Sequence, residues 1–356
     1  MPSLKEIKGR INSISSTLAI TSAMKMVAAA KLQKAQMAIQ NMLPYERRLY
    51  SMLVDLMGAM NISAAASEDG SVRGSGSAER GFDQSGDRLS LSNRHDLAGM
   101  DGAYSLMAQR EVRKVAIVAF ASNSSLCGAF NSNVIREATA VINEYRASGL
   151  GDADITVYSV GRKMAEAMKK LGFPSPADFT KMSDSPSYDA ASALAQELFD
   201  GFVSGRFDKV ELVYNHYKST SSQPTTRQTY LPLSLADATA DIQVGKITDS
   251  ASEPYTDKVA EPVVRQNSPT TETPDLIVEP SKEELIATLL PKVVRLRVFT
   301  TLLDSTAAEH AARTVAMQLA TDNGNDLLQE LTLEYNKGRQ QKITSEILDI
   351  VGGSLQ

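Results

Sequence analysis

The feature that most constrains this chain is an apolar seam through its first 56 residues. Its positions step alternately by three and four without a slip, which is the heptad repeat of a helix packed lengthwise against another helix. Ser3 and Glu6 form a capping box at its start, and Pro44 is expected to bend or break the helix locally. The seam consists of Leu4, Ile7, Ile11, Ile14, Leu18, Thr21, Lys25, Ala28, Leu32, Ala35, Ile39, Met42, Glu46, Leu49, Leu53 and Leu56.

A second long helix is predicted at the C-terminal end of the chain. Ser281 and Glu284 form another capping box, and Gly352-Gly353 is expected to end the helix. The late steps depart from the strict heptad, which locally relaxes a supercoil. Its apolar positions are Ile286, Leu289, Val293, Leu296, Leu303, Ala307, Leu328, Leu331, Tyr335, Ile343, Ile347 and Ile350, and Pro291 lies among them.

Between these helices, short β-branched runs alternate with helical stretches, which is typical of an α/β layer with a mostly parallel sheet. The predicted strands are Lys114–Phe120, Asp154–Gly161, Lys209–Asn215 and Thr226–Leu233, and the predicted helices are Asn131–Arg146, Arg162–Leu171 and Ala190–Phe202. We therefore expect the α/β fold class: a long antiparallel coiled coil plus a Rossmann-like foot domain. The expected divisions are an N-terminal helix (1–60), a linker (61–110), the foot (111–235), an acidic Thr/Pro/Ser-rich insertion (236–275) and a C-terminal helix (276–356).

Two terminal helices that flank one domain most simply pair with each other, with the domain at their shared end. If Leu56 lies beside Ser281, residues 28–30 lie across from about residues 307–309, which are also rich in alanine. Small side chains on both helices allow a close approach of the helix axes.

The same register pairs Met1 with about Asn336 and leaves about 20 residues, or about 30 Å of helix, without a partner in the chain. Ile343, Ile347 and Ile350 lie in this part. An isolated, partly apolar helical tip needs a socket in another protein.

The charge distribution points to an acidic partner for the first helix. The chain carries a net charge of −5, yet no acidic residue lies between Ile7 and Tyr45. The partner surface could be protein or nucleic acid, or the basic face could simply be solvated. The second helix is mixed in charge, which counts against a nucleic-acid-binding arm.

The sequence offers little for catalysis. It contains no Walker A loop, no G-x-G-x-x-G after a strand and no G-x-S-x-G elbow. His95, His216 and His310 are scattered, which favours structural or surface roles, and Cys127 lacks a recognisable partner, which favours a packing or turn role. As the lone cysteine, Cys127 also excludes an intramolecular disulfide. We expect no catalytic residues, no cofactor and no metal site, although a nucleotide-dependent enzyme built on the α/β layer stays an alternative.

Several segments together resemble the γ subunit family of F-type ATP synthase. The opening helix carries "IKGRINSISSTLAITSAMKMVAAAKLQKAQ", and the closing helix carries "EHAARTVAMQLATDNGNDLLQELTLEYNKGRQQKITSEILDIVGG". "LCGAFN", "LVYN" and "IVEPSKEEL" match as well. One departure is "ASNSSLCG", where the family more usually has aspartate-arginine-glycine-leucine before the cysteine.

The resemblance implies a rotor shaft inside a ring of alternating α and β subunits, with its tip in an apolar sleeve. The foot would meet the ε subunit and the membrane c-ring, and no nucleic acid would be bound. Met24 and Lys25 match the motif beside an acidic loop of the β subunit, and Arg313 matches a family arginine near that segment. Gln340 and Thr344 match polar positions that contact a β-subunit catch loop.

The mechanism so implied is mechanical. Proton flow turns the c-ring, foot and shaft, and the rotating shaft biases each β site between open and closed states. No secretory signal or transit peptide is expected, so the predicted location is peripheral, on the cytoplasmic face of a bacterial inner membrane. The alternative is a coiled-coil scaffold or nucleic-acid-binding arm with an α/β domain.

Overall fold

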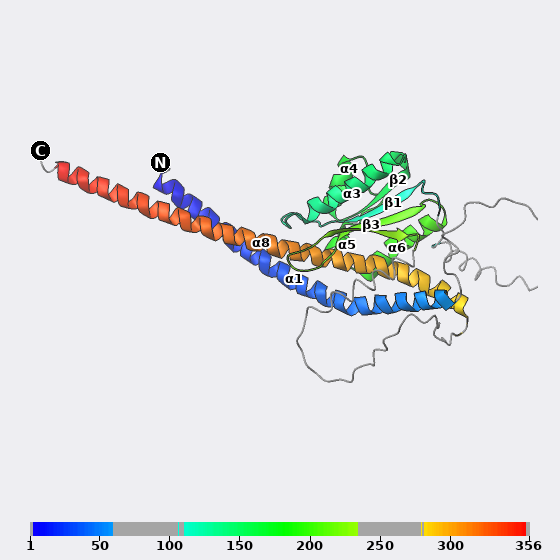
Figure 1. The fold of residues 1–356 in the computed structure, drawn as a ribbon. Helices are drawn as coiled ribbons and strands as arrows, with labels where there is room; N and C mark the ends of the chain where they lie inside the picture. The colour runs from blue at the N-terminus through cyan, green and yellow to red at the C-terminus, as the bar shows by residue number, and fades with distance from the viewer. Residues whose placement is uncertain (1–2, 60–105, 107–109, 234–278, 280, 354–356) are drawn as a thin grey trace, which may run out of the picture.

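The computed structural model describes residues 3–59, 106, 110–233, 279 and 281–353. The predicted linker, apart from Leu106 and Arg110, and the whole predicted acidic insertion lie outside the described residues. Figure 1 shows two long helices running side by side, with an α/β domain packed against one end of the pair. We call the helix pair the shaft and residues 110–233 the foot.

The shaft consists of α1 (Leu4–Ala59) and α8 (Lys282–Gly353), and both helices run without interruption through an internal proline. Of the bend or break expected at Pro44, the break is wrong, because Pro44 lies on the exposed side of α1, where water can satisfy the carbonyl group that loses its partner. Both predicted caps are confirmed, because the Glu6 and Glu284 backbone amides each donate a hydrogen bond of 3.2 Å to the serine hydroxyl three residues earlier.

The predicted seam is the contact line between the two helices. Every one of its positions in α1 is buried or half-buried, and none is exposed. Its one acidic member, Glu46, is 6% exposed and forms an ion pair with Arg297 of α8 at 3.5 Å. The Arg297 guanidinium also lies over the Tyr50 ring, 5.5 Å from its centroid. A heptad pattern alone therefore located the buried face of the helix.

The register between the helices differs from the predicted one. Thr21 and Thr321 are hydrogen-bonded at 3.2 Å, and a Cβ atom added at Gly338 would come within 3.2 Å of Leu4. The predicted register placed Leu4 opposite Leu333, so α8 is shifted by five residues, from 333 to 338. The predicted register assumed that Leu56 and Ser281 lie at the same level of the shaft. In the structure, α8 begins at Lys282, about one turn before the residue that lies opposite Leu56. Residues 339–353, which we call the tip, therefore lie beyond Leu4.

The alanine-rich stretch of α8 faces two partners. Ala307 and Ala311 pack against Leu32 and Ala35 of α1, as small side chains in a close helix pair should. A second set of alanines lies on a different side of α8 and faces the foot. Ala308 and Ala312 pack against Cys127 and Phe130, and Ala316 lies 3.7 Å from an ideal Cβ at Gly128.

The foot is a four-stranded sheet in the order β2-β1-β3-β4, in which β1 is parallel to β2 and β3, and β4 is antiparallel to β3. All predicted strands and helices are confirmed within a few residues at their ends; the short helix α5 was not predicted. The elements are β1 (Val115–Phe120), α3 (Phe130–Ala147), a 3₁₀ turn (Asp152–Asp154), β2 (Ile155–Val160), α4 (Arg162–Lys170), α5 (Thr180–Asp184), α6 (Tyr188–Val203), β3 (Lys209–Asn215) and β4 (Thr225–Leu231).

The sheet is covered on both faces. Helices α3 and α4 lie on one face, and the shaft with α6 lies on the other (Figure 1). Strand β1, with the sequence VAIVAF, is buried along its whole length, as expected for a parallel strand between two helical layers. The base of the shaft is thus part of the core of the foot, where Leu53 of α1 and Leu290 of α8 join the strands in one cluster.

We predict that Ala311→Leu lowers the free energy of unfolding by about 1–3 kcal/mol, because the larger side chain would be forced into a close-packed contact with α1. Chemical denaturation of the purified chain measures this change. Ala320→Leu is the matched control, since Ala320 is exposed on the same helix and its substitution should change stability by about 0.5 kcal/mol or less. Equal effects of the two substitutions would contradict the close approach.

Candidate functional site

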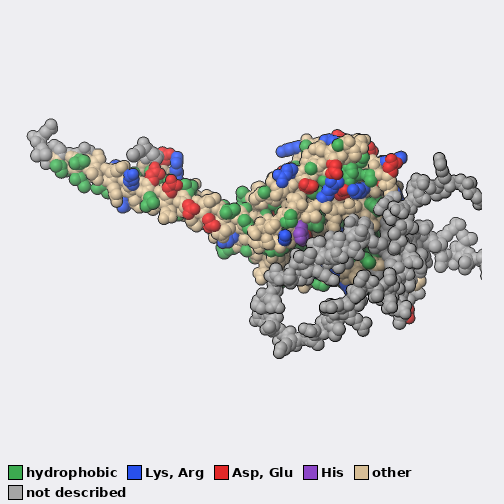
Figure 2. Space-filling model, viewed as in Figure 1, with side chains coloured by type: hydrophobic (Ala, Val, Ile, Leu, Met, Phe, Trp, Pro, Cys, Tyr) green, Lys and Arg blue, Asp and Glu red, His purple; other side chains and the backbone are tan. Residues whose placement is uncertain are grey.

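The tip exposes apolar side chains to solvent. Ile343, Ile347 and Ile350 are 48%, 55% and 71% exposed, and Figure 2 shows hydrophobic side chains along this end of the shaft. The Thr344 hydroxyl donates to the Gln340 carbonyl at 2.9 Å, and both residues are exposed. A row of apolar side chains on a projecting helix marks a surface for another protein.

The middle of the shaft presents a second apolar surface on α1. Met24 and Lys25 are half-buried at the edge of the helix contact, whereas their neighbours Met26 and Val27 are 66% and 58% exposed. Ile20, seven residues before Val27, is 61% exposed. The seam could have identified Ile20 and Val27, because both fall outside it and therefore face away from α8.

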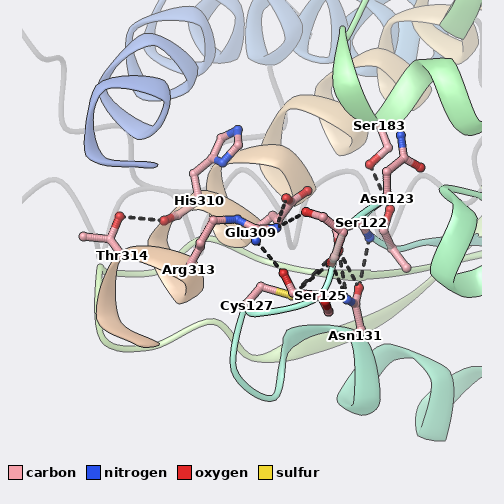
Figure 3. Close-up of polar contacts among 12 residues, drawn as sticks. Ser122, Asn123, Ser125, Cys127, Asn131, Ser183, Glu309, His310, Arg313 and Thr314 are labelled. Atoms are coloured by element: carbon pink, nitrogen blue, oxygen red, sulfur yellow. Dashed lines mark hydrogen bonds and ion pairs between the residues drawn. The ribbon is translucent and has the colours of Figure 1, made fainter. Parts of the chain in front are cut away.

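Arg313 differs from the other predicted contact residues because its side chain is 9% exposed and points into the chain. It extends from α8 toward the loop that follows β1 (Figure 3). Its guanidinium donates to the Ser125 carbonyl at 2.6 Å and to the Ser124 hydroxyl at 2.8 Å. It also pairs with Glu309, one turn earlier, at 2.7 Å. These groups of its own chain hold the Arg313 side chain, and its contact with a β subunit stays a prediction.

Two titratable groups beside Arg313 are shifted toward their neutral forms. Burial raises the pKa of Glu309, although the Arg313 guanidinium opposes this shift. Burial, together with the charges of Lys31 and Arg313, lowers the pKa of His310 to about 4. His310 is therefore a neutral imidazole at neutral pH, and its buried Nδ1 atom has no hydrogen-bond partner.

A second polar contact joins foot and shaft at the loop that follows β3. The Asp304 carboxylate of α8 accepts a hydrogen bond from the Tyr217 amide at 2.8 Å and lies 2.7 Å from His216 Nδ1. The Tyr217 hydroxyl in turn accepts a hydrogen bond of 2.6 Å from Gln36 of α1. This loop therefore holds both helices of the shaft.

The loop after β1 is itself firmly built. Cys127 is 1% exposed and packs with Phe130 and Ala308, which is the packing role predicted for it. Leu126 adopts a left-handed conformation with φ of 67°. The Asn131 side chain holds Ser122 and the Ser124 carbonyl. Ser124 and Ser125 were not predicted as functional residues, because only the fold brings them to Arg313.

Within the described residues, three or more His, Cys, Asp or Glu side chains nowhere gather closely enough to hold a metal ion. In the same part of the chain, no helix combines the length and apolar character needed to cross a membrane. His95 lies outside the described residues.

Comparison with known proteins decides the family. A family model described as ATP synthase matches residues 3–355. The ATP synthase gamma chain of Phocaeicola vulgatus is 48% identical over 355 residues, covering 100% of both chains, and that of Bacteroides thetaiotaomicron is 45% identical over 356 residues, again covering 100% of both.

The chain belongs to the ATP synthase gamma chain family. A chain in the structure of Euglena gracilis mitochondrial ATP synthase (OSCP/F1/c-ring, rotational state 3) has the same fold, with a TM-score of 0.52 and 18% identity over 99% of this chain and 93% of that one. The family predicted from the terminal motifs is thus confirmed and is supported over the scaffold or nucleic-acid-binding alternative. The contact residues carried over from the gamma chain family stay predictions.

We predict that the chain loses stability as the pH falls from 6.5 to 4, in part through His310. In this window the unfolded histidine binds a proton that the folded one does not, so stability falls with falling pH. The loss is at most about 3 kcal/mol, and about half of that after allowance for the partial exposure of the ring.

His310→Gln should remove this part of the pH dependence, because an amide does not titrate. Thermal unfolding at pH 7.5 and pH 4.5 measures it. At pH 7.5 the variant and the natural chain should unfold alike, since both carry a neutral side chain. An unchanged difference between the two pH values in the variant would contradict the shift.

Proposed function

We propose that this chain is the rotating central shaft of a proton-translocating ATP synthase. It turns inside a ring of α and β subunits and couples rotation of the membrane c-ring to ATP synthesis or hydrolysis at the β sites. Family membership supports the assignment. The single observation that carries the mechanism is the unequal length of the paired helices, which leaves the apolar tip beyond Leu4.

The tip is suited to turn within a socket rather than to bind in one orientation. Its exposed isoleucines offer apolar contact, which is non-directional and tolerates rotation about the helix axis. A surrounding apolar sleeve would cover Ile343, Ile347 and Ile350 and hold the end of α8 on the axis. Gln340, one turn before Ile343, and Thr344, between Ile343 and Ile347, are exposed polar groups within reach of a loop of the ring.

The middle of the shaft supplies the coupling. A two-helix shaft is not round, so each β subunit meets a different face as the shaft turns. Only a contact whose free energy differs between open and closed β states can bias them. Met24 and Lys25 stand beside exposed Met26 and Val27. Flexible methionine and a mobile ammonium group suit a surface that meets three partner conformations in turn.

The foot lies at the end of the shaft opposite the tip (Figure 1). It is therefore the end that meets the ε subunit and the c-ring. The chain contributes no catalytic residue of its own in this mechanism, and the nucleotide sites belong to the surrounding subunits. As part of a bacterial ATP synthase it would lie peripherally on the cytoplasmic face of the inner membrane.

The direct test is purification of the tagged chain from its own membranes. We expect α, β and ε subunits and the c-ring to co-purify in a complex that hydrolyses ATP, and a probe attached to the foot to rotate during hydrolysis. Recovery of the chain alone, or bound to nucleic acid, would refute the proposal and favour a coiled-coil scaffold.

We predict that removal of residues 343–356 changes the free energy of unfolding by no more than about 0.5 kcal/mol, because the described apolar side chains there are exposed. The truncation should nevertheless weaken assembly with the ring or lower the torque, which rotation against a viscous load measures. Truncation from Leu331 is the comparison. Leu331 is 7% exposed, and its loss with the following turns should cost about 2 kcal/mol or more.

We also predict that Met24→Arg impairs rotation. A new charge-assisted hydrogen bond to an acidic β loop, worth about 1.5–3 kcal/mol, would hold one angular position and slow rotation roughly tenfold or more. ATP hydrolysis and ATP-driven proton pumping in membrane vesicles measure this. Met37→Arg is the control, because Met37 is 52% exposed on α1 but lies at the level of the foot. Equal effects at both positions would argue against a specific contact at Met24.

A further inference from the structure

The foot has the edge at which open α/β sheets usually bind a ligand. The chain passes from β1 to β2 on one side of β1, and β3 later pairs on its other side. This reversal makes the carboxyl ends of β1 and β3 a topological switch point, where the following loops normally enclose a ligand crevice. In this chain, the loops at that point are residues 121–129 after β1 and residues 216–224 after β3.

Helix α8 occupies this place. The loop after β1 packs on Ala308 and Ala312, and Gly128 faces Ala316. The loop after β3 holds Asp304 through the Tyr217 amide. The residues that border the two loops are also joined, because the side chain of Asn215, at the end of β3, donates to the carbonyl of Phe130, at the start of α3, at 3.0 Å. Residues 304–316 of α8 therefore lie at the edge of the sheet where related α/β sheets bind a ligand.

Arg313 is the polar centre of this contact. Its side chain is 9% exposed and makes two hydrogen bonds to one foot loop and an ion pair within α8. The planar guanidinium can bind the Ser125 carbonyl, the Ser124 hydroxyl and Glu309 at once, which a lysine ammonium on a flexible stem does less well. Side chains that approach this closely and are held by charge-assisted bonds resist sliding and twisting.

The contact between the two foot loops and α8 lies where the shaft leaves the foot. Beyond Ala316, α8 contacts α1 at Thr321 and Gly324, and Figure 1 shows the shaft continuing away from the foot. The two loops therefore hold α8 near the end of the foot from which the shaft projects (Figure 1). A twisting load that enters through the foot passes into the projecting shaft at this level.

We propose that the switch-point edge of the foot is the joint that transmits torque to the shaft, and that Arg313 is the positioning residue that locks α8 into it. This inference rests on the proposed rotary function and adds to it the place where foot and shaft are coupled. It gives Arg313 a role within this chain.

Hydrogen exchange in the assembled complex with α and β subunits tests where Arg313 acts. In Arg313→Met, carried with Glu309→Gln so that no unpaired carboxylate stays buried, amides of residues 121–130 should exchange roughly tenfold faster or more. Arg313→Lys should give an intermediate rate. Arg295→Met is the matched control, because Arg295 joins α8 to Gln196 of α6 at 2.6 Å and should leave these amides unchanged. Unchanged exchange in the Arg313 variants would overturn the proposal.

A reversible cross-link tests whether the joint carries torque. The Cβ separation of 3.7 Å between positions 128 and 316 suits a disulfide, so Gly128→Cys with Ala316→Cys, and Cys127→Ser to prevent mispairing, can close the joint in the Arg313→Met, Glu309→Gln chain. In a stalled complex, the angular spread of a probe on the foot should widen in the reduced form and narrow again on oxidation. Equal spread in the natural, reduced and oxidised forms would overturn the proposal.

The outcomes separate this inference from the rotary function. Suppose that the complex assembles and rotates, but that the amide exchange of residues 121–130 and the angular spread of the probe are the same with and without the Arg313 substitution. This result would refute the joint and leave the rotary function standing. Slower ATP hydrolysis in the Arg313 variants with unchanged loop exchange would also refute the joint and assign Arg313 to a contact with the ring. Failure to assemble or rotate in the natural chain would refute the rotary function itself.

Discussion

The lengthwise packing of α1 against α8 is the interaction on which the rest of the structure depends. The seam continues from the free part of the shaft into the core of the foot, where Leu53 and Leu290 join the strands in one cluster. The foot therefore folds onto the helix pair and does not hang from it by a linker. The tip follows from the same pairing, because α1 begins at Leu4 and leaves the rest of α8 without a partner helix.

Buried charge is used sparingly and in two different ways. Glu211 in β3 is 1% exposed, yet Arg227, Lys209 and Tyr145 all donate to it; burial alone would raise its pKa, but these donors lower it. Glu309 has Arg313 as its donor, and its pKa is raised. A buried pair with so few bonds adds little net stability because desolvation offsets the attraction. Its value lies in fixing where α8 sits against the foot.

The sequence was most informative where a single periodic pattern determines the outcome. The seam, the two serine caps, Cys127 as a packing residue and the apolar strands follow from local spacing, and all are found in the structure. The register could not be obtained in this way, because a heptad defines which face is buried and leaves the axial position open. If α8 moves along α1 so that Gly338 instead of Leu333 lies opposite Leu4, the same face of each helix stays buried. Only the tertiary contacts therefore decide between the two registers.

The alanines of α8 and Arg313 show the second limit of local patterns. Ala307 and Ala308 are neighbours in sequence, but Ala307 packs against α1 and Ala308 packs against the foot. The alanine-rich sequence alone does not indicate that two different surfaces pack against it. The same ambiguity applies to function. The foot has the strand order and loop positions of a nucleotide-binding sheet, and fold alone would permit an enzyme. The side chains at its switch point contact a helix of their own chain, through the packing of Cys127 and Phe130 on Ala308 and through the hydrogen bonds of Arg313.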